Sequence, residues 1–246
     1  PTYYIVHMGS SAETVYTEGY DWEISTTSFN PVTVATNPIT FNYSDIWYWT
    51  VEAVNGVGST VVEPPFSFQI EPDPAITGLP YAQNFDLIST PNLPSGWTAY
   101  KGNSAQSLYS TTTYSQTTPN SVYMYNSNYS AVPLRLISPQ ILVPLNTIKF
   151  SFWVRAGGTG YPLQIGTVNA LDGTGVFTEV ASITPSSSTA FVEYAISFAA
   201  YGGTDQYICI QHGQGGTYRS FYLDSFLFEQ LFTTDQIGRA SCRERV

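Results

Sequence analysis

Short runs of β-branched and aromatic residues, interrupted by turn residues every several positions, dominate this chain of 246 residues. In residues 47–54 (WYWTVEAV) alternate side chains form two sets, as in a strand with one buried and one partly exposed face. No window repeats apolar residues at the helical spacing i, i+3, i+4. The sequence therefore predicts an all-β protein of the sandwich or barrel type. Strands are expected in its first part near residues 3–8, 33–36, 46–54 and 66–70.

The charge balance excludes several classes of protein. The formal net charge is −10, yet only 11% of the residues are charged. A nucleic-acid binder needs a basic face that displaces phosphate counterions, so nucleic acid is not an expected partner. A hydrophobic content of 43% argues against intrinsic disorder. No run of about 18 apolar residues is present, so no membrane insertion is expected.

Two prolines in residues 71–74 (EPDP) mark the clearest break in the chain, because neither can donate a backbone hydrogen bond to a neighbouring strand. We place a linker at 71–78, one domain at 1–70 and a second at 79–231, followed by a tail at 232–246. No short repeat of fixed period is visible, which argues against a solenoid or propeller. Because the chain begins with Pro1 rather than Met, we expect its natural start to lie elsewhere.

The last ten residues, IGRASCRERV at 237–246, differ in character from the rest of the chain. They contain three of the eight basic residues and one of the two cysteines. The string resembles the in-frame translation of a sequencing-library adapter, and the alternative is a short basic surface tail. On the adapter interpretation Cys209 is the only native cysteine, so we expect neither a disulfide nor a cysteine-pair metal site. We interpret Cys209 as a buried small hydrophobic residue.

The first segment carries an ordered set of motifs. These are Y-x-V-x-x-G at residues 4–9, an aromatic strand with Asn and Gly at 47–58, and F-S-F at 66–68. In this order they resemble a fibronectin type III module of bacterial surface proteins. Such a module has about seven strands in roughly 90–100 residues. The resemblance therefore implies a truncated fibronectin type III sandwich that lacks its first two strands and leaves an apolar face open.

The second segment opens with L-P-Y-x-x-N-F-D at residues 79–86 and L-P-x-G-W at 93–97. Four further motifs follow in order: L-I-S-P at 136–139, F-x-F-W-V at 150–154, Y-I-x-I-Q-H at 207–212 and Y-L-D-x-F at 222–226. Together they resemble the cleaved-adhesin or choice-of-anchor domains of secreted Bacteroidota proteins. The resemblance spans nearly the whole segment and implies a MAM-like jelly-roll β-sandwich.

The same resemblance implies a structural calcium ion where the opening strand meets the closing one. Its two acidic ligands fall on Asp86 and Asp224, and backbone carbonyls and water would complete the six to eight oxygens that calcium takes. Ser225 stands where the family has a second closing acid, which removes one strong ligand. The alternative is that Asp86 caps a turn and Asp224 accepts hydrogen bonds from backbone amides at a strand end.

The sequence assigns no catalytic residue. His212 could in principle join Asp205 or Asp224 and a serine in a triad, but no G-x-S-x-G turn presents a serine nucleophile. The only other histidine is His7, and H-E-x-x-H is absent, which argues against zinc catalysis. We interpret the remaining candidate acids as solvated turn and strand-edge residues: Asp172, Glu179 and Glu193. We therefore expect this fragment not to be an enzyme.

Tyrosines are dense between residues 109 and 129, at Tyr109, Tyr114, Tyr123, Tyr125 and Tyr129. They could form an aromatic platform for a sugar ring, because each side chain has an apolar face and a polar tip. Alternation at Tyr123 and Tyr125 is also what a half-buried strand shows, and the sequence favours this second interpretation. It assigns no ligand-binding residue.

The family resemblance implies a non-catalytic adhesion or binding region of a larger secreted or cell-surface bacterial protein. Its expected partner is a protein or carbohydrate on a host or extracellular surface. The alternative is a set of accessory domains belonging to a secreted peptidase or glycoside hydrolase whose catalytic domain lies outside this fragment.

Overall fold

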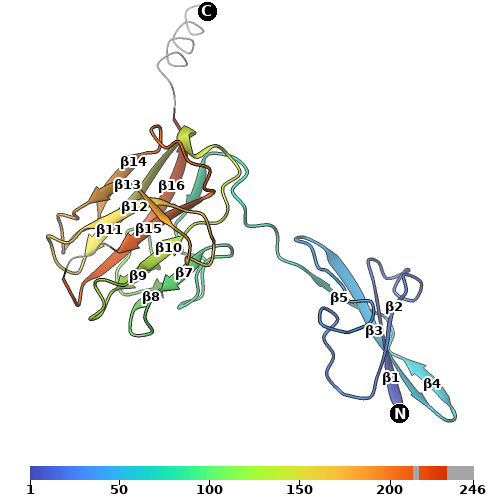
Figure 1. Ribbon diagram of the computed structural model, residues 1–246. Coiled ribbons are helices and arrows are strands. Elements are labelled where there is room, and N and C mark those ends of the chain that lie inside the picture. Colours follow the sequence, from blue (N-terminus) through green and yellow to red (C-terminus); the bar gives the residue numbers. More distant parts are fainter. Residues whose placement is uncertain (213–215, 232–246) are drawn as a thin grey trace, which may run out of the picture. The chain divides into compact units, whose positions relative to one another are not determined.

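The computed structural model describes residues 1–212 and 216–231, and they form two compact units, one from Pro1 to Asp73 and one that begins at Pro74 (Figure 1). Nearly all of their regular structure is antiparallel β-sheet, which confirms the all-β prediction. The helical structure in these residues is a single 3-10 turn, η1 (Leu145–Thr147). No helix in these ranges is long and apolar enough to span a membrane. The tail at 232–246, including the adapter-like string, lies outside the described residues.

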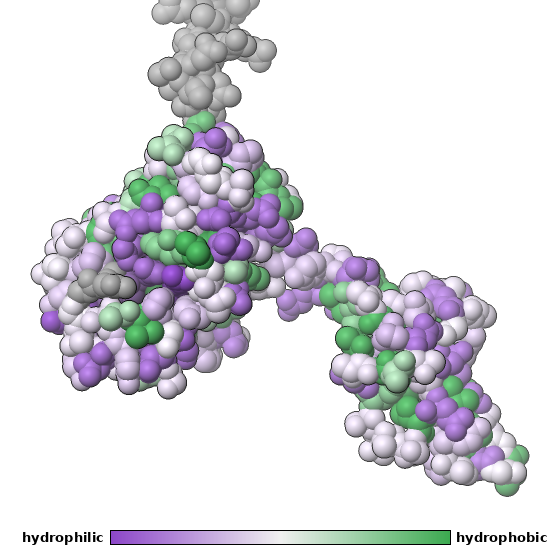
Figure 2. All heavy atoms as spheres, in the orientation of Figure 1, coloured by the Kyte–Doolittle hydropathy of each residue, from purple (hydrophilic) through white to green (hydrophobic). Residues whose placement is uncertain are grey.

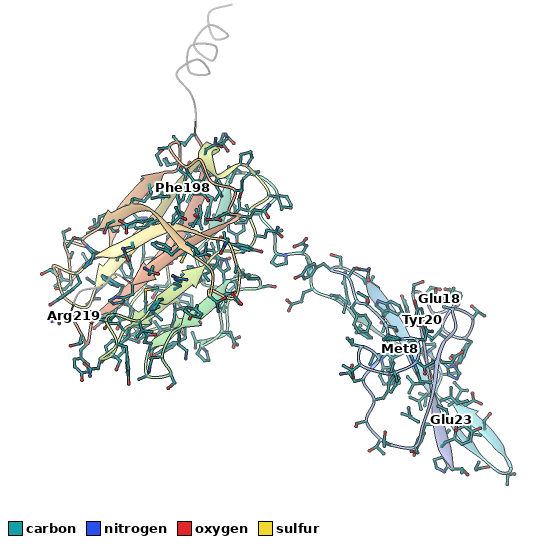
Figure 3. All side chains as sticks on the ribbon, in the orientation of Figure 1. Met8, Glu18, Tyr20, Glu23, Phe198 and Arg219 are labelled. Atoms are coloured by element: carbon teal, nitrogen blue, oxygen red, sulfur yellow. The ribbon has the colours of Figure 1, made fainter. Side chains whose placement is uncertain are left out.

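The first unit is a single antiparallel sheet in the order β2-β1-β3-β4, with β5 paired to the other half of β3. Its strands are β1 (Tyr3–Gly9), β2 (Tyr20–Ile24), β3 (Ile46–Asn55), β4 (Gly58–Val61) and β5 (Phe66–Gln69). Met8 on β1 stands opposite Tyr20 on β2, and both side chains are labelled in Figure 3. A small core gathers on one face of this sheet, formed by Val6, Met8, Trp22, Ile39 and Trp47.

The strand expected at residues 33–36 is wrong. These residues lie in turns and bends of the connection between β2 and β3. A strand needs a neighbour for its backbone groups, and the described part of the first unit supplies no second sheet in which this segment could pair. The likeness of this unit to a fibronectin type III module stays a prediction.

The second unit is a sandwich of two antiparallel sheets. One sheet has the order β13-β12-β15-β10-β7 and the other β14-β11-β16-β9-β8, with β6 paired to the end of β16. The strands of the first sheet are β7 (Thr98–Lys101), β10 (Leu134–Ile137), β12 (Leu163–Val168), β13 (Phe177–Ile183) and β15 (Tyr207–His212). Those of the second are β6 (Tyr81–Gln83), β8 (Ser107–Thr111), β9 (Ser121–Tyr125), β11 (Ile148–Ala156), β14 (Val192–Ser197) and β16 (Ser220–Gln230).

Alternation along each strand builds the core between these two sheets, because successive side chains point to opposite faces. The motifs that are far apart in the sequence meet in an aromatic cluster there. The ring of Phe226 lies 5.1 Å from that of Phe85 and 5.3 Å from that of Trp97, measured between centroids. Phe150 and Phe152 of β11 pack on the same ring. Aromatic packing therefore holds the two opening motifs against the closing strand, β16.

Candidate functional site

Asp224 lies on β16 with its side chain fully buried. Its Oδ2 accepts hydrogen bonds from the backbone N–H groups of Gln116 at 2.6 Å and Thr117 at 3.0 Å, and its Oδ1 accepts one from the N–H of Ser225 at 2.6 Å. The register of β16 against β11 shifts at this point, between Ser151 and Trp153. Asp224 is the last residue of β16 before this shift and is two residues from Tyr222, so its side chain lies on the same outer face, where it meets the loop between β8 and β9.

Asp86 follows the aromatic anchor Phe85 in the chain. Its Oδ1 accepts a hydrogen bond from the backbone N–H of Asn120 at 3.2 Å, at the end of the same loop that reaches Asp224. Phe85 and Ser225, which flank the two acids, both have positive φ values, 63° and 53°. Non-glycine residues seldom take this conformation, and where they do the strain often marks a functional site.

Asn120 is the third polar side chain at this site, and no sequence motif points to it. Its amide nitrogen donates hydrogen bonds to the carbonyl oxygens of Phe85 and Ile88, at 3.1 and 2.7 Å. Its Oδ1 is buried and has no hydrogen-bond partner in the described residues. A buried acceptor without a partner is costly, and a missing ion or water is one established reason for it.

The negative charges of Asp86 and Asp224 are close enough to affect the pKa of Asp224. Burial raises the pKa of Asp224 to about 6, against the opposing effect of the three N–H donors, and the negative charge of Asp86 raises it further. Two carboxylates whose charges repel each other and the unpartnered amide oxygen of Asn120 are all oxygen donors, the kind that a hard cation takes. We name Asp86, Asn120 and Asp224 the acidic site.

Both carboxylates of the acidic site accept hydrogen bonds from backbone N–H groups. Asp224 accepts three backbone N–H bonds and Asp86 accepts one. A carboxylate has about four acceptor positions, and the Ser225 hydroxyl, 3.5 Å from Oδ1, is a fourth donor to Asp224, so the lone pairs left for a cation lie chiefly on Asp86. In the part of the chain that the structure describes, no group of three or more His, Cys, Asp or Glu side chains could hold a metal. A cation at the acidic site would therefore depend on the Asn120 oxygen and on backbone carbonyls or water.

His212 and Asp205, which were weighed for a catalytic triad, each contact a different residue. The Nε2 atom of His212 is 3.1 Å from the carbonyl oxygen of Arg219, and its ring packs on Phe221. Asp205 accepts a hydrogen bond from the hydroxyl of Thr167 at 2.6 Å.

Asp172 and Glu179, two of the other candidate acids, accept hydrogen bonds from polar groups near them. Asp172 accepts hydrogen bonds from the N–H and hydroxyl of Thr174, which lower its pKa. Glu179 accepts one from the side chain of Gln164. Burial raises the pKa of the Cys209 thiol, whose side chain is fully enclosed, as the sequence interpretation requires.

The tyrosines gather on the outer face of the second sheet. Their strand neighbours point into the core, since Leu108, Val122, Met124, Phe221 and Leu223 are buried there. We name the resulting array the tyrosine surface; it consists of Tyr109, Tyr114, Tyr123, Tyr125 and Tyr222. These rings are partly buried, as the interpretation of a half-buried strand predicts. Tyr109 and Tyr114 nevertheless remain 37% and 41% exposed.

A hollow lies on one face of the first unit. It has a volume of about 630 Å³ and is lined mainly by apolar and aromatic side chains from β1, β2, β3, β5 and the connection between β2 and β3, among them Val6, Met8, Phe29, Trp49 and Val51. Apolar residues at the surface of this unit are visible in Figure 2.

Comparison with known proteins gives a fold but no family. No protein-family model matches the sequence, and no curated protein matches it either. Among solved structures, the K2 cleaved adhesin domain of Lys-gingipain has a TM-score of 0.51 at 16% identity, over 62% of this chain and 99% of that one. The K3 cleaved adhesin domain of Lys-gingipain from Porphyromonas gingivalis W83 has a TM-score of 0.49 at 11% identity, over 61% and 98%.

The CBM22-1 xylan-binding domain of Paenibacillus barcinonensis Xyn10C is a more distant match, with a TM-score of 0.44 at 13% identity over 65% of this chain and 99% of that one. The likeness to the K2 domain confirms, at the level of the fold, the predicted resemblance to cleaved adhesin domains. The second unit therefore shares the β-sandwich fold of the K2 domain.

Proposed function

We propose that this chain is a non-catalytic adhesion or binding region of a larger secreted or cell-surface protein. The observation that carries the proposal is the fold shared with the K2 cleaved adhesin domain, which the chain matches over 99% of that domain's length. Fold alone does not define function, so the proposal also uses the exposed tyrosine surface, because exposed aromatic side chains mark interaction sites. Its partner would be a protein or a carbohydrate on a host or extracellular surface.

The test is binding of the full chain to two immobilised panels, one of extracellular-matrix proteins and one of polysaccharides. We expect saturable binding to at least one member, without cleavage of that member on prolonged incubation. Cleavage would contradict the proposal. A catalytic motif in the complete reading frame of the source gene would instead favour accessory domains of a peptidase or glycoside hydrolase.

We further propose that the acidic site holds a structural calcium ion through oxygens of Asp86, Asn120 and Asp224. The unpartnered oxygen of Asn120 and the raised pKa of Asp224 support this assignment. When bound, the ion would offset the repulsion between the two carboxylates. The side chains themselves tie the opening segment, the loop between β8 and β9 and the closing strand together. The role of the ion would be to stabilise the fold rather than to perform chemistry.

A further inference from the structure

The tyrosine surface is a continuous row of rings that crosses three strands. The ring centroid of Tyr109 on β8 lies 5.4 Å from that of Tyr123 on β9, which lies 5.1 Å from that of Tyr222 on β16. Tyr114, in the loop after β8, meets Tyr222 edge to face at 4.9 Å. Tyr125 extends the row along β9, with its ring centroid 6.0 Å from that of Tyr123.

The loop that carries Tyr114 is fastened at several points. Arg155 on β11 holds the ring, since its guanidinium carbon lies 3.4 Å from the ring centroid, and its Nε donates a hydrogen bond to the carbonyl of Ser188. The hydroxyl of Ser121 donates a hydrogen bond to the carbonyl of Tyr114. Two residues further on, the backbone of Gln116 is bonded to Asp224. The row is therefore held in place before any ligand arrives, which lowers the entropic cost of binding.

The chemistry of this row is apolar and hydrogen-bonding, but nearly uncharged. Strands β8 and β9 contain no charged residue, and the charge of Arg155 faces the ring of Tyr114. Burial and the neighbouring tyrosines raise the pKa of Tyr123 to about 12, so its hydroxyl stays protonated at neutral pH and can both donate and accept hydrogen bonds. Outer faces of sandwich sheets are usually polar, so five neighbouring aromatic rings need another explanation.

A neutral polysaccharide matches these properties. A sugar ring has an apolar C–H face that packs on an aromatic ring and a rim of hydroxyls that pairs with phenol groups. A row of rings across a sheet offers contacts to successive sugar units, whereas a single sugar would need an enclosing pocket. A protein partner is less well matched, because the exposed aliphatic side chains among the described residues of this unit lie on loops and not on β8, β9 or β16: Leu87, Leu142, Leu171 and Val176.

We propose that the tyrosine surface binds a neutral polysaccharide chain. This inference rests on the proposed function and names the ligand class and the surface. Binding is carried by ring contacts of the exposed members, Tyr109 and Tyr114, with the more buried rings of the row beneath and between them. The interaction is predicted to be insensitive to salt, since no ion pair contributes to it.

The test is affinity electrophoresis of the full chain in native gels that contain xylan, mixed-linkage β-glucan, mannan or starch. We expect at least one of these to retard the wild-type chain, and the Tyr109→Ala/Tyr114→Ala variant to bind it about a hundredfold more weakly, about tenfold for each ring. The matched control is Tyr129→Ala, because Tyr129 is 38% exposed and has no ring contact with the row. It should bind like the wild type. Tyr109→Phe should retain most of the affinity, since it keeps the ring.

Several results would overturn the inference. Equal retardation of the double variant and the wild type would show that the tyrosine surface is not the binding site, while leaving the proposed binding function intact. Two results would show that the ligand is not a carbohydrate. One is retardation in none of the four gels, and the other is binding to a matrix protein alone that the double variant loses. Sedimentation velocity showing a dimer that the double variant abolishes would assign the surface to a second copy of the chain. A thermal midpoint of the double variant equal to that of the wild type shows that any lost binding is not unfolding.

Discussion

The buried carboxyl of Asp224 is expected to lower the stability of the second unit as the pH rises, and bound calcium is expected to restore it. Burial and the charge of Asp86 raise its pKa from 3.8 to about 6 in the folded chain. Below pH 3.8 the carboxyl is protonated in both the folded and the unfolded chain, and its contribution to stability is complete. As the pH rises toward 6 the unfolded chain loses the proton first, so this contribution is lost. The difference of about two pKa units corresponds to about 3 kcal/mol.

The assay is urea unfolding followed by tryptophan fluorescence, with a chelator present, at steps from pH 4 to pH 7. The comparison is between the wild type and Asp224→Asn, because the amide does not titrate and all other groups cancel in the difference. We expect the free energy of unfolding of the wild type, relative to that of the variant, to fall by about 2 kcal/mol over this range, because part of the contribution is already lost at pH 4. The transition that differs between the two proteins identifies the second unit, whose Trp97 lies beside Phe85 in the core.

Calcium should reverse this behaviour. An ion that binds only the folded chain stabilises it by about 2.7 kcal/mol when its concentration is 100 times the dissociation constant, and it favours the ionised carboxylate. With 10 mM calcium, a concentration chosen to exceed the roughly millimolar or tighter dissociation constants of extracellular calcium sites, the wild type should gain stability at pH 7 and Asp224→Asn should gain much less. A wild-type-minus-variant difference that stays flat from pH 4 to pH 7 in chelator would refute the assignment of the raised pKa. Identical calcium responses of the two proteins would refute the proposed ion.

Three further predictions concern the core of the second unit. Phe226→Ala should lower the free energy of unfolding by about 3–5 kcal/mol in urea, because it empties the centre of the aromatic cluster, and Phe226→Leu should cost less. Gly173→Ala should lower the thermal midpoint, since Gly173 has φ +75° and an added Cβ would overlap the side chain of Tyr100. Gly202→Ala, where nothing lies near the added Cβ, should leave the midpoint unchanged. In a Cys242→Ser background, Cys209 should react with iodoacetamide only above the urea midpoint; rapid labelling of the native chain would contradict its burial.

Much of the fold was accessible from local sequence patterns. Alternation and turn residues are properties of neighbouring residues, so they predicted strands such as residues 46–54 whose observed bounds, Ile46–Asn55, differ by a single residue. The segment at 33–36 had the same local character but formed no strand. Its propensity was decided by whether a partner strand was present, and that is a property of the whole unit.

The acidic site shows the same division. Family resemblance selected Asp86 and Asp224, and the structure gives both of them contacts with one loop. Asn120 could not be predicted from the sequence, because asparagine is common in turns. Only its burial with an unpartnered oxygen distinguishes it.

What the sequence determined by itself was the β architecture, the acidic net charge and the ordered motifs of the second segment. What only the tertiary structure decided was which side chains share a face and which stay exposed. Five tyrosines spread over residues 109–222 form one row because β8, β9 and β16 are neighbours in a sheet, and strand order cannot be read from alternation alone. Local periodicity sets the face of the sheet to which each side chain points, whereas long-range strand pairing decides which other side chains it contacts.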